Sequence, residues 1–360
     1  MASTIQILLF GDVGDAVLTM PALHAVRSHF PDSRIQVLCK PAIGSFLSDS
    51  GLVDEVIAVE KTAFDSPLSL FDPRRLAALL ALWLRLRSSR PDMVIVFHHL
   101  VRRWGGLKCA ALALAGGAGR RVGLDNGRGW FLTDRVPDRG FGAVHESEYW
   151  RQVAAAVGAD TRQGWRLPVK RRDAQRIEDL LRELKVDGTE LVALHPGTGA
   201  YGPGRRWAAE SFATAAGIIA GSSDVHFVVV GTDIDKEAAA QVCKVLGSRA
   251  TDLTGRTRLG ELAALLARCR LSIANDGGVG HISAAVGTPV VSIFGPSNDL
   301  AWRPLLGTVV RANLPCRPCF YRDFQTGNRF GCRTRECLTW IRPQDVASAA
   351  LRILGDARVA

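Results

Sequence analysis

The sequence predicts an α/β protein with two Rossmann-like domains, each built on a parallel sheet that helices cover on both faces. Short apolar, β-branched segments alternate with amphipathic helical segments along almost the whole chain, as in parallel sheets. This pattern restarts at Leu191, after a polar helical segment. The 360 residues also suffice for two domains that each bury a core.

The first half alternates strands and helices almost from its beginning. The predicted strands are Ile5–Phe10, Ile35–Cys39, Val56–Val59 and Met93–Phe97, and the helices between them include Pro21–Ser28 and Pro73–Arg87. All four strands are apolar runs of strand length, so we expect them in the core of one sheet.

The second half repeats the alternation. The predicted strands are Leu191–His195, His226–Val230, Leu271–Ala274 and Val290–Phe294, and the helices are Ala208–Ala220, Asp235–Leu246, Leu259–Cys269 and Gly280–Val286. A last helix, Pro343–Leu354, begins with proline in its first turn, and we expect it to pack back on the first domain. We therefore divide the chain into a domain over 1–165, a linker region over 166–190, a domain over 191–342 and a C-terminal helix region over 343–360.

Composition narrows the class of protein. Hydrophobic residues make up 47% and charged residues 22%, which excludes a disordered or collagen-like chain. The formal charge is +10, and 38 of the 45 basic residues are arginine. Arginine binds carboxylates and phosphates through its planar fork, so the excess indicates anionic ligands or, equally, only a compositional bias. No nucleic-acid-binding module is evident, and we expect no nucleic-acid partner.

The ends and apolar runs predict a cytoplasmic protein. No segment reaches the roughly 18 apolar residues of a membrane span. The N-terminus lacks the basic region of a signal peptide, so we expect a reducing compartment in which disulfides are rare.

In open parallel sheets, ligands bind beyond the carboxyl ends of the strands, so we expect the functional residues in the loops there. The first loop, Gly11–Ala16, follows the first strand and matches neither G-x-G-x-x-G nor a P-loop. Asp15 in this loop either caps the next helix or presents a carboxylate at the helix N-terminus. Residue chemistry by itself favours the cap.

The second loop, His195–Gly199, continues to Gly202–Trp207. Its glycines, the hydroxyl of Thr198 and the adjacent Arg205 and Arg206 would suit a phosphate, which helix N-termini and guanidinium forks both bind. A glycine-rich connection with solvated arginines is an equally good interpretation.

The third loop, Asn275–His281, places three glycines at a helix N-terminus, where exposed N–H groups can receive an oxyanion. His281 lies in the first turn of that helix, which favours a functional role over a packed core histidine. A D-x-D triplet, Asp233 and Asp235, could hold Mg²⁺ or Mn²⁺, but two carboxylates are few for a metal and a helix cap is the better interpretation. No G-x-S-x-G elbow occurs, which excludes an α/β-hydrolase site of that type.

Four cysteines crowd the segment 316–337 in the order Cys316-x₂-Cys319-x₁₂-Cys332-x₄-Cys337. Four thiolates at this spacing could hold a structural Zn or Fe ion. The alternative is that they are reduced or partly paired.

Together these loops resemble glycosyltransferase family 9, the heptosyltransferases of lipopolysaccharide core assembly. The matching segments are 11–38, 195–213, 253–299 and the cysteine-containing tail, in the order and spacing of the family. The resemblance implies the GT-B architecture, in which two Rossmann-like domains face each other across a cleft. It assigns acceptor binding to 1–165 and nucleotide-sugar binding to 191–342, and it implies inverting, metal-independent transfer of a heptose from ADP-heptose.

The resemblance also assigns roles to residues. The family's catalytic base falls on Asp15, which would remove the proton of the acceptor hydroxyl. The implied donor-binding residues are Thr198, Gly199, Arg205, Arg206, Asp233, Asp235, Asp276, Gly278, Val279, Gly280 and His281. Arg205 replaces the family's usual lysine, and Gly277 stands where threonine is common.

The expected acceptor is an anionic glycolipid at a membrane surface, such as the lipopolysaccharide inner core. Between Arg102 and Arg139 there are seven arginines and one lysine against three aspartates, and we expect Arg102, Arg103, Arg120 and Arg121 to bind the acceptor. The alternative, which residue type alone favours, is that these four are solvated surface arginines. The enzyme would then lie peripherally at the inner face of the cytoplasmic membrane. Two alternatives stay open: a heptosyltransferase with a protein or small-metabolite acceptor, and a catalytically silent nucleotide-sugar-binding protein.

Overall fold

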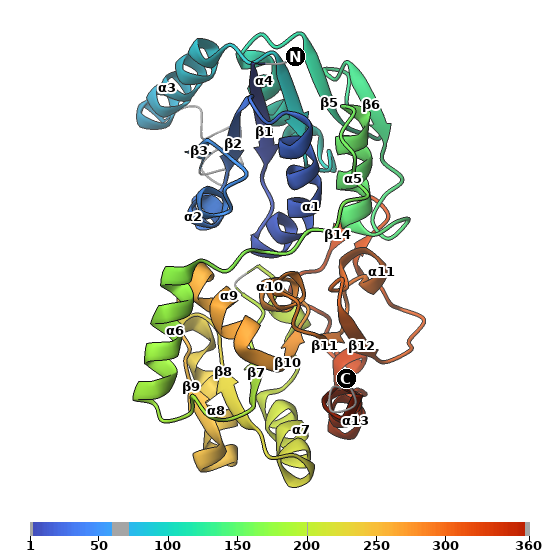
Figure 1. Cartoon of the computed structure of the whole chain (residues 1–360). Coiled ribbons are helices and arrows are strands. Elements are labelled where there is room, and N and C mark those ends of the chain that lie inside the picture. Colours follow the sequence, from blue (N-terminus) through green and yellow to red (C-terminus); the bar gives the residue numbers. More distant parts are fainter. Residues whose placement is uncertain (1–2, 60–71, 200, 357–360) are drawn as a thin grey trace. The chain divides into compact units, whose positions relative to one another are not determined.

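The computed structural model describes residues 3–59, 72–199 and 201–356, and it forms two compact units, Met1–Trp165 and Arg166–Ala360 (Figure 1). Each unit holds a six-stranded sheet in which all paired neighbours run parallel. The predicted α/β class with two parallel sheets is confirmed.

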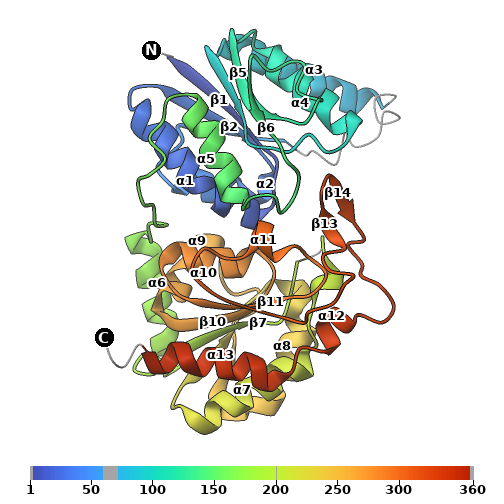
Figure 2. The same cartoon turned by 90° about the vertical axis from the view of Figure 1, so that its right-hand side faces the viewer.

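The sheet of the first unit has the order β3-β2-β1-β4-β5-β6. Its strands are β1 Thr4–Leu9, β2 Arg34–Cys39, β3 Glu55–Ala58, β4 Met93–Val96, β5 Arg120–Asp125 and β6 Asp134–Pro137, and its helices are α1 Val13–His29, α2 Pro41–Asp49, α3 Pro73–Ser89, α4 Arg103–Ala115 and α5 Glu146–Ala156. Helices α1 and α5 pack side by side on one face of the sheet, and α3 and α4 cover the other (Figure 2). Strand order reverses between β1 and β4, and open sheets bind ligands at such a switch point.

The second sheet has the order β12-β11-β10-β7-β8-β9, with its reversal between β7 and β10. Its strands are β7 Leu191–His195, β8 His226–Val229, β9 Ala250–Asp252, β10 Cys269–Asn275, β11 Val290–Phe294 and β12 Gly307–Arg311. The α-helices are α6 Arg171–Glu183, α7 Ala209–Ser222, α8 Lys236–Leu246, α9 Leu259–Arg268, α10 Gly278–Val286, α11 Asp299–Trp302, α12 Glu336–Thr339 and α13 Pro343–Asp356, with short 3₁₀ turns at Pro203–Arg205, Asp233–Asp235 and Gly247–Arg249 and a hairpin of β13 Phe320–Arg322 and β14 Gln325–Gly327.

The second unit, Arg166–Ala360, includes both the predicted linker region and the predicted last helix. The region 166–190 is not a free linker, because α6 packs against α9 inside the second unit. The last helix, α13, is part of the second unit. Its buried residues, Val346 and Ala350 among them, join α7 and the second sheet in one hydrophobic core. Residues 357–360 of the predicted helix region lie outside the described residues.

Sequence patterns predicted the central elements and missed several at the margin of the first sheet. Strand β5 starts with two arginines and contains a glycine, and β6 is a short edge strand that ends in proline. Helix α4 contains two glycines, which weaken the helical signal. Within the described residues, no helix is long and apolar enough to cross a membrane.

Candidate active site

Asp15 lies in the first turn of α1, directly after β1 and at the switch point of the first sheet. One carboxylate oxygen, Oδ2, accepts a hydrogen bond from the backbone N–H of Asp12 at 2.8 Å. Burial raises the pKa of Asp15 to about 6; the Asp12 N–H opposes this effect, and the Asp12 and Glu146 carboxylates add to it. Asp15 is therefore both a helix cap and a carboxylate of increased basicity.

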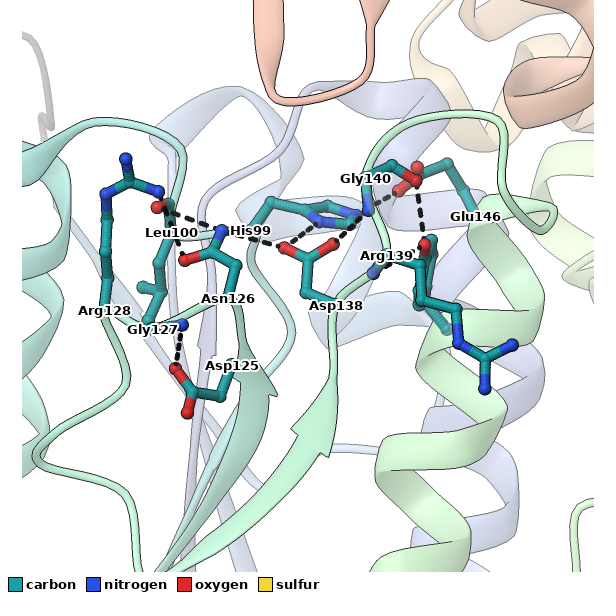
Figure 3. Close-up of polar contacts among 11 residues, drawn as sticks. His99, Leu100, Asp125, Asn126, Gly127, Arg128, Asp138, Arg139, Gly140 and Glu146 are labelled. Carbon is teal, nitrogen blue, oxygen red and sulfur yellow. Dashed lines mark hydrogen bonds and ion pairs between the residues drawn. The ribbon is translucent and has the colours of Figure 1, made fainter.

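Three buried side chains that the sequence analysis did not single out gather at the same edge of this sheet (Figure 3). His99 follows β4, and its Nδ1 lies 3.0 Å from Asp138 Oδ2 while its Nε2 lies 3.0 Å from Glu146 Oε2. Burial lowers the pKa of His99, but the charge of Glu146 and the hydrogen bond to Asp138 outweigh it and raise that pKa to about 10. His99 is thus an imidazolium that donates to both carboxylates.

A sequence signal for this cluster existed. His98 and His99 come directly after the predicted strand Met93–Phe97, at the strand end where ligands bind. The two partners of His99 lie 39 and 47 residues further along the chain, after β6 and at the start of α5, which are elements that the sequence pattern did not predict.

In the second unit, the predicted donor residues lie in loops that follow three neighbouring strands, β10, β7 and β8. Arg205 Nη1 pairs with Asp276 Oδ2 at 3.2 Å, and both side chains are largely buried. These residues are 71 positions apart in the chain, and the structure joins them across the switch point of the second sheet. Thr198 is buried on the β7 loop, and Gly199 beside it has a positive φ.

The two acids of the D-x-D triplet have different environments. Asp235 is buried, accepts hydrogen bonds from the N–H and hydroxyl of Thr232, and pairs with Arg206 Nη2 at 3.3 Å. Burial raises the pKa of Asp235, but His195 and Thr232 outweigh it and lower that pKa. Asp233 is exposed and pairs with Lys236 at 2.7 Å, so only Asp233 has a solvent-facing carboxylate.

Helix α10 begins at Gly278, immediately after Asp276 and Gly277. Gly277 at the N-cap has no side chain to cap the helix, so the N–H groups of the first turn face outward from the helix end. Val279, Gly280 and His281 in this turn are buried.

Asn275, which the sequence analysis did not assign a role, fixes these loops together. Its Nδ2 donates to the carbonyls of Pro196 and Gly197 at 2.9 and 3.1 Å, and its Oδ1 accepts from the N–H of Trp207 at 3.0 Å. One buried amide therefore sets the spacing between the β7 loop and α10.

The sequence profile of glycosyltransferase family 9 (heptosyltransferase) matches residues 79–328, more than half of the chain. The chain belongs to glycosyltransferase family 9.

Individual relatives agree with this membership. The chain of this family 9 glycosyltransferase is 21% identical to lipooligosaccharide heptosyltransferase 2 of Campylobacter jejuni serotype O:6 over 93% of its own length and 94% of the relative's. With lipooligosaccharide heptosyltransferase 2 of Campylobacter jejuni serotype O:2 it is 26% identical, but the match spans only 47% of the chain and 52% of that relative.

Solved structures show the same fold. The chain superimposes on Escherichia coli ADP-heptose lipopolysaccharide heptosyltransferase II with a TM-score of 0.73 and 21% identity, over 99% of each chain. For the family 9 glycosyltransferase of Veillonella parvula the TM-score is 0.76 at 22% identity, over 98% of this chain and 97% of the other. The predicted GT-B fold is confirmed.

The four arginines expected to bind the acceptor do not gather at one place in this family 9 glycosyltransferase. Arg102 and Arg103 follow β4 at the carboxyl edge of the first sheet, where Asp15 also lies. Arg120 and Arg121 begin β5 and so lie at the opposite edge. Arg120 pairs with Asp134 at 3.1 Å, and Arg121 Nε donates to the Phe131 carbonyl at 2.6 Å. Both arginines therefore stabilise the structure at this edge of the sheet.

The predicted metal centre on the cysteine segment is not supported. Among residues 3–59, 72–199 and 201–356, no three His, Cys, Asp or Glu side chains are arranged to hold a metal ion. Cys337 packs in the hydrophobic core of the second unit, and burial raises the pKa of its thiol to about 11. Cys316, Cys319 and Cys332 are exposed instead.

Proposed function

We propose that this family 9 glycosyltransferase moves a heptose from ADP-heptose to an anionic acceptor, such as the lipopolysaccharide inner core, with inversion at the anomeric carbon. Family membership and the names of its relatives support the class of reaction. The solved relatives include an Escherichia coli heptosyltransferase with ADP, which supports an adenine nucleotide donor. The observation that carries the proposal is the Asp15 carboxylate, basic and half-buried at a helix N-terminus beside a strand switch point.

Asp15 acts as general base. It takes the proton of the acceptor hydroxyl while that oxygen attacks the anomeric carbon, and the bond from this carbon to the diphosphate breaks on the opposite side. The leaving ADP keeps the bonding electron pair, so the configuration inverts. A pKa near 6 leaves Asp15 ionised at neutral pH and still basic enough to accept the proton.

The second unit holds the donor. Arg205 and Arg206 supply guanidinium forks for the diphosphate, and their ion pairs with Asp276 and Asp235 hold both forks in place before the donor binds. The first turn of α10 adds backbone N–H groups for the charge that develops on the departing diphosphate. Asp233 is the acid that contacts the ribose, since Asp235 is committed to Thr232 and Arg206.

The first unit binds the acceptor and contacts the membrane surface. Arg102 and Arg103 are the acceptor-binding arginines, because they share an edge with Asp15. Helix α3 carries four arginines and no acidic residue, and Leu76, Leu80 and Leu84 are exposed along it at helical spacing. An apolar helix face flanked by arginine is the form of a surface that binds anionic membranes.

The test is Asp15→Asn, which keeps size and hydrogen bonding and removes the base. We expect turnover to fall at least about a hundredfold, as loss of a general base implies. Titration calorimetry with ADP should give an affinity within about threefold of the wild type, because the donor residues lie in the other unit. The matched control is Asp32→Asn, an exposed position after α1, which should leave turnover unchanged.

Two results would contradict the proposal. Wild-type turnover in Asp15→Asn would remove Asp15 as the base. A wild-type protein that binds ADP and transfers no heptose to any anionic glycolipid would favour the catalytically silent binding protein, while transfer only to a protein or small metabolite would change the acceptor.

A further inference from the structure

The cluster of His99, Asp138 and Glu146 has no part in the chemistry proposed above. All three side chains are more than nine-tenths buried. Burying ionised groups is costly, and a well-packed apolar core is often as stable as a buried ion pair. The rings of Phe141, Tyr149 and Trp150 surround His99 at 4.9 to 5.2 Å, so apolar packing was available at this place. This makes stability a weak reason for the cluster.

The two carboxylates of the cluster accept different numbers of hydrogen bonds (Figure 3). Asp138 accepts hydrogen bonds from His99, from Asn126 Nδ2 at 3.1 Å and from the N–H of Gly140 at 2.9 Å. Glu146 accepts only from His99 through Oε2, and its buried Oε1 has no hydrogen-bond partner in the described part of the chain. One imidazolium faces two carboxylates, and Glu146 accepts fewer hydrogen bonds than Asp138.

The topology brings the charge of Glu146 to the base. Glu146 is the first residue of α5, which packs along α1, and Asp15 lies in the first turn of α1. Both helices begin at the carboxyl edge of the same parallel sheet, so the two carboxylates lie at neighbouring helix starts. Burial is the largest cause of the raised pKa of Asp15, and the Glu146 carboxylate is one of the groups that raise it further.

Other charged groups also act on Asp15. Lys40, which follows β2, pairs with Asp12 at 2.6 Å, so a cation and an anion act on Asp15 from that side. Tyr149 on α5 stays neutral, because burial raises its pKa to about 12. Glu146 and Asp12 are therefore the two carboxylates whose charges raise the pKa of Asp15, and only Glu146 belongs to the buried cluster.

We propose that Glu146 is a positioning residue for the Asp15 base: His99 and Asp138 fix it in one orientation, and its carboxylate makes Asp15 a stronger acceptor for the proton of the attacking hydroxyl. The inference rests on the proposed function. Glu146 takes no proton itself. The acceptor proton moves to Asp15, the hydroxyl oxygen forms the new bond to the anomeric carbon, and the diphosphate leaves with the electrons of the broken bond.

The experiment is the pH dependence of kcat/KM in wild type, Glu146→Gln and Glu146→Asp. Without the negative charge, the acidic limb of the Glu146→Gln profile should move down by about half to one pH unit, and the plateau should fall about 3- to 10-fold because the base is weaker. KM for the donor should stay within about twofold of the wild-type value, because a residue that acts only in the transition state changes kcat and not substrate binding. Glu146→Asp keeps the charge and should return the acidic limb to its wild-type position. An acidic limb that does not move in Glu146→Gln overturns the proposal, whatever happens to the rate.

A second measurement needs no activity. In protein labelled with ¹⁵N at histidine, both ring nitrogens of His99 should be protonated at pH 8, and Glu146→Gln should lower the pKa of His99 by at least about one unit. A wild-type His99 that loses its proton below pH 8 overturns the arrangement even if Glu146→Gln fails to fold. The Asp15→Asn variant distinguishes failure of the proposed function from failure of this inference. Wild-type activity in Asp15→Asn would exclude Asp15 as the base, whereas the ¹⁵N titration reports independently whether His99 donates to Glu146.

Discussion

Asp15 occupies surroundings that disfavour its charged form. Burial is the main cause, and the carboxylates of Asp12 and Glu146 contribute, so the pKa of Asp15 is about 6 in the folded chain. The pKa of an aspartate in an unfolded chain is about 3.9, so the folded state loses stability as the pH rises through this interval. The same shift makes Asp15 a better base than an exposed carboxylate would be.

This trade-off predicts the stability of Asp15→Asn. The raised pKa means that wild type has its full stability below about pH 4 and loses part of it as the pH rises through about 6. Asparagine cannot ionise, so the variant should be more stable than wild type by about 1–2 kcal/mol at pH 8, with no difference near pH 4. Urea unfolding at both pH values measures this. Asp32→Asn should show no such pH-dependent gain, and a less stable Asp15→Asn at pH 8 would contradict the assigned environment of Asp15.

At the scale of elements, the proposed donor site depends on close contact between loops that follow different strands. Gly197 lies in the β7 loop, in close contact with Asp235 in the turn after β8. A Cβ built on Gly197 would overlap the Asp235 carboxylate, which also holds Arg206. The absence of a side chain at Gly197 therefore allows the Arg206 ion pair to form.

Gly197→Ala tests this contact. The added methyl must displace Asp235, so we expect the affinity for ADP to fall about tenfold or more and stability to fall by about 1–3 kcal/mol. Titration calorimetry with ADP and thermal unfolding measure the two effects. The control is Gly217→Ala within α7, where a Cβ would meet no atom within 4 Å, so ADP affinity should not change. Normal ADP binding by Gly197→Ala would mean that the Arg206–Asp235 pair does not contribute to the donor site.

At the scale of the whole molecule, the basic residues that produce the net charge of +10 lie in several different environments. Arg205 and Arg206 belong to the proposed donor site, while Arg120 and Arg121 stabilise the edge of the sheet at the start of β5. The arginines of α3 accompany an exposed apolar face, and that combination suits an anionic membrane surface better than a small ligand.

Vesicle sedimentation tests the membrane contact. We expect the protein to bind vesicles that contain anionic phospholipid and to be released as the salt concentration rises, because screening weakens the arginine contribution. Replacing Leu80 and Leu84 of α3 by glutamate should reduce binding about fivefold or more. The matched control, Val245→Glu, changes an equally exposed apolar residue on α8 and should bind as wild type does. Equal binding by all three proteins would exclude α3 as the contact.

The sequence was most informative where its pattern was local. Central strands such as Ile5–Phe10 and Leu191–His195 were predicted because they are continuous apolar runs buried on both faces of a sheet. Asp15 and the residues of the predicted donor loops were assigned because they lie within short segments that follow those strands and resemble motifs of the family. Edge elements such as β6 and glycine-containing helices such as α4 lack this pattern, and the sequence analysis missed them.

Tertiary structure decided what depends on distant partners. By itself the sequence determined two parallel α/β units, their strand ends and the family. It did not determine that α13 completes the core of the second unit, that Arg120 lies at the edge away from Asp15, or that Cys337 is buried. Nor did it reveal that His99 meets Glu146, 47 residues further on. Hydrophobic periodicity reports the local environment of a segment, whereas the charge state of His99 and the basicity of Asp15 depend on carboxylates that only the folded sheet brings near.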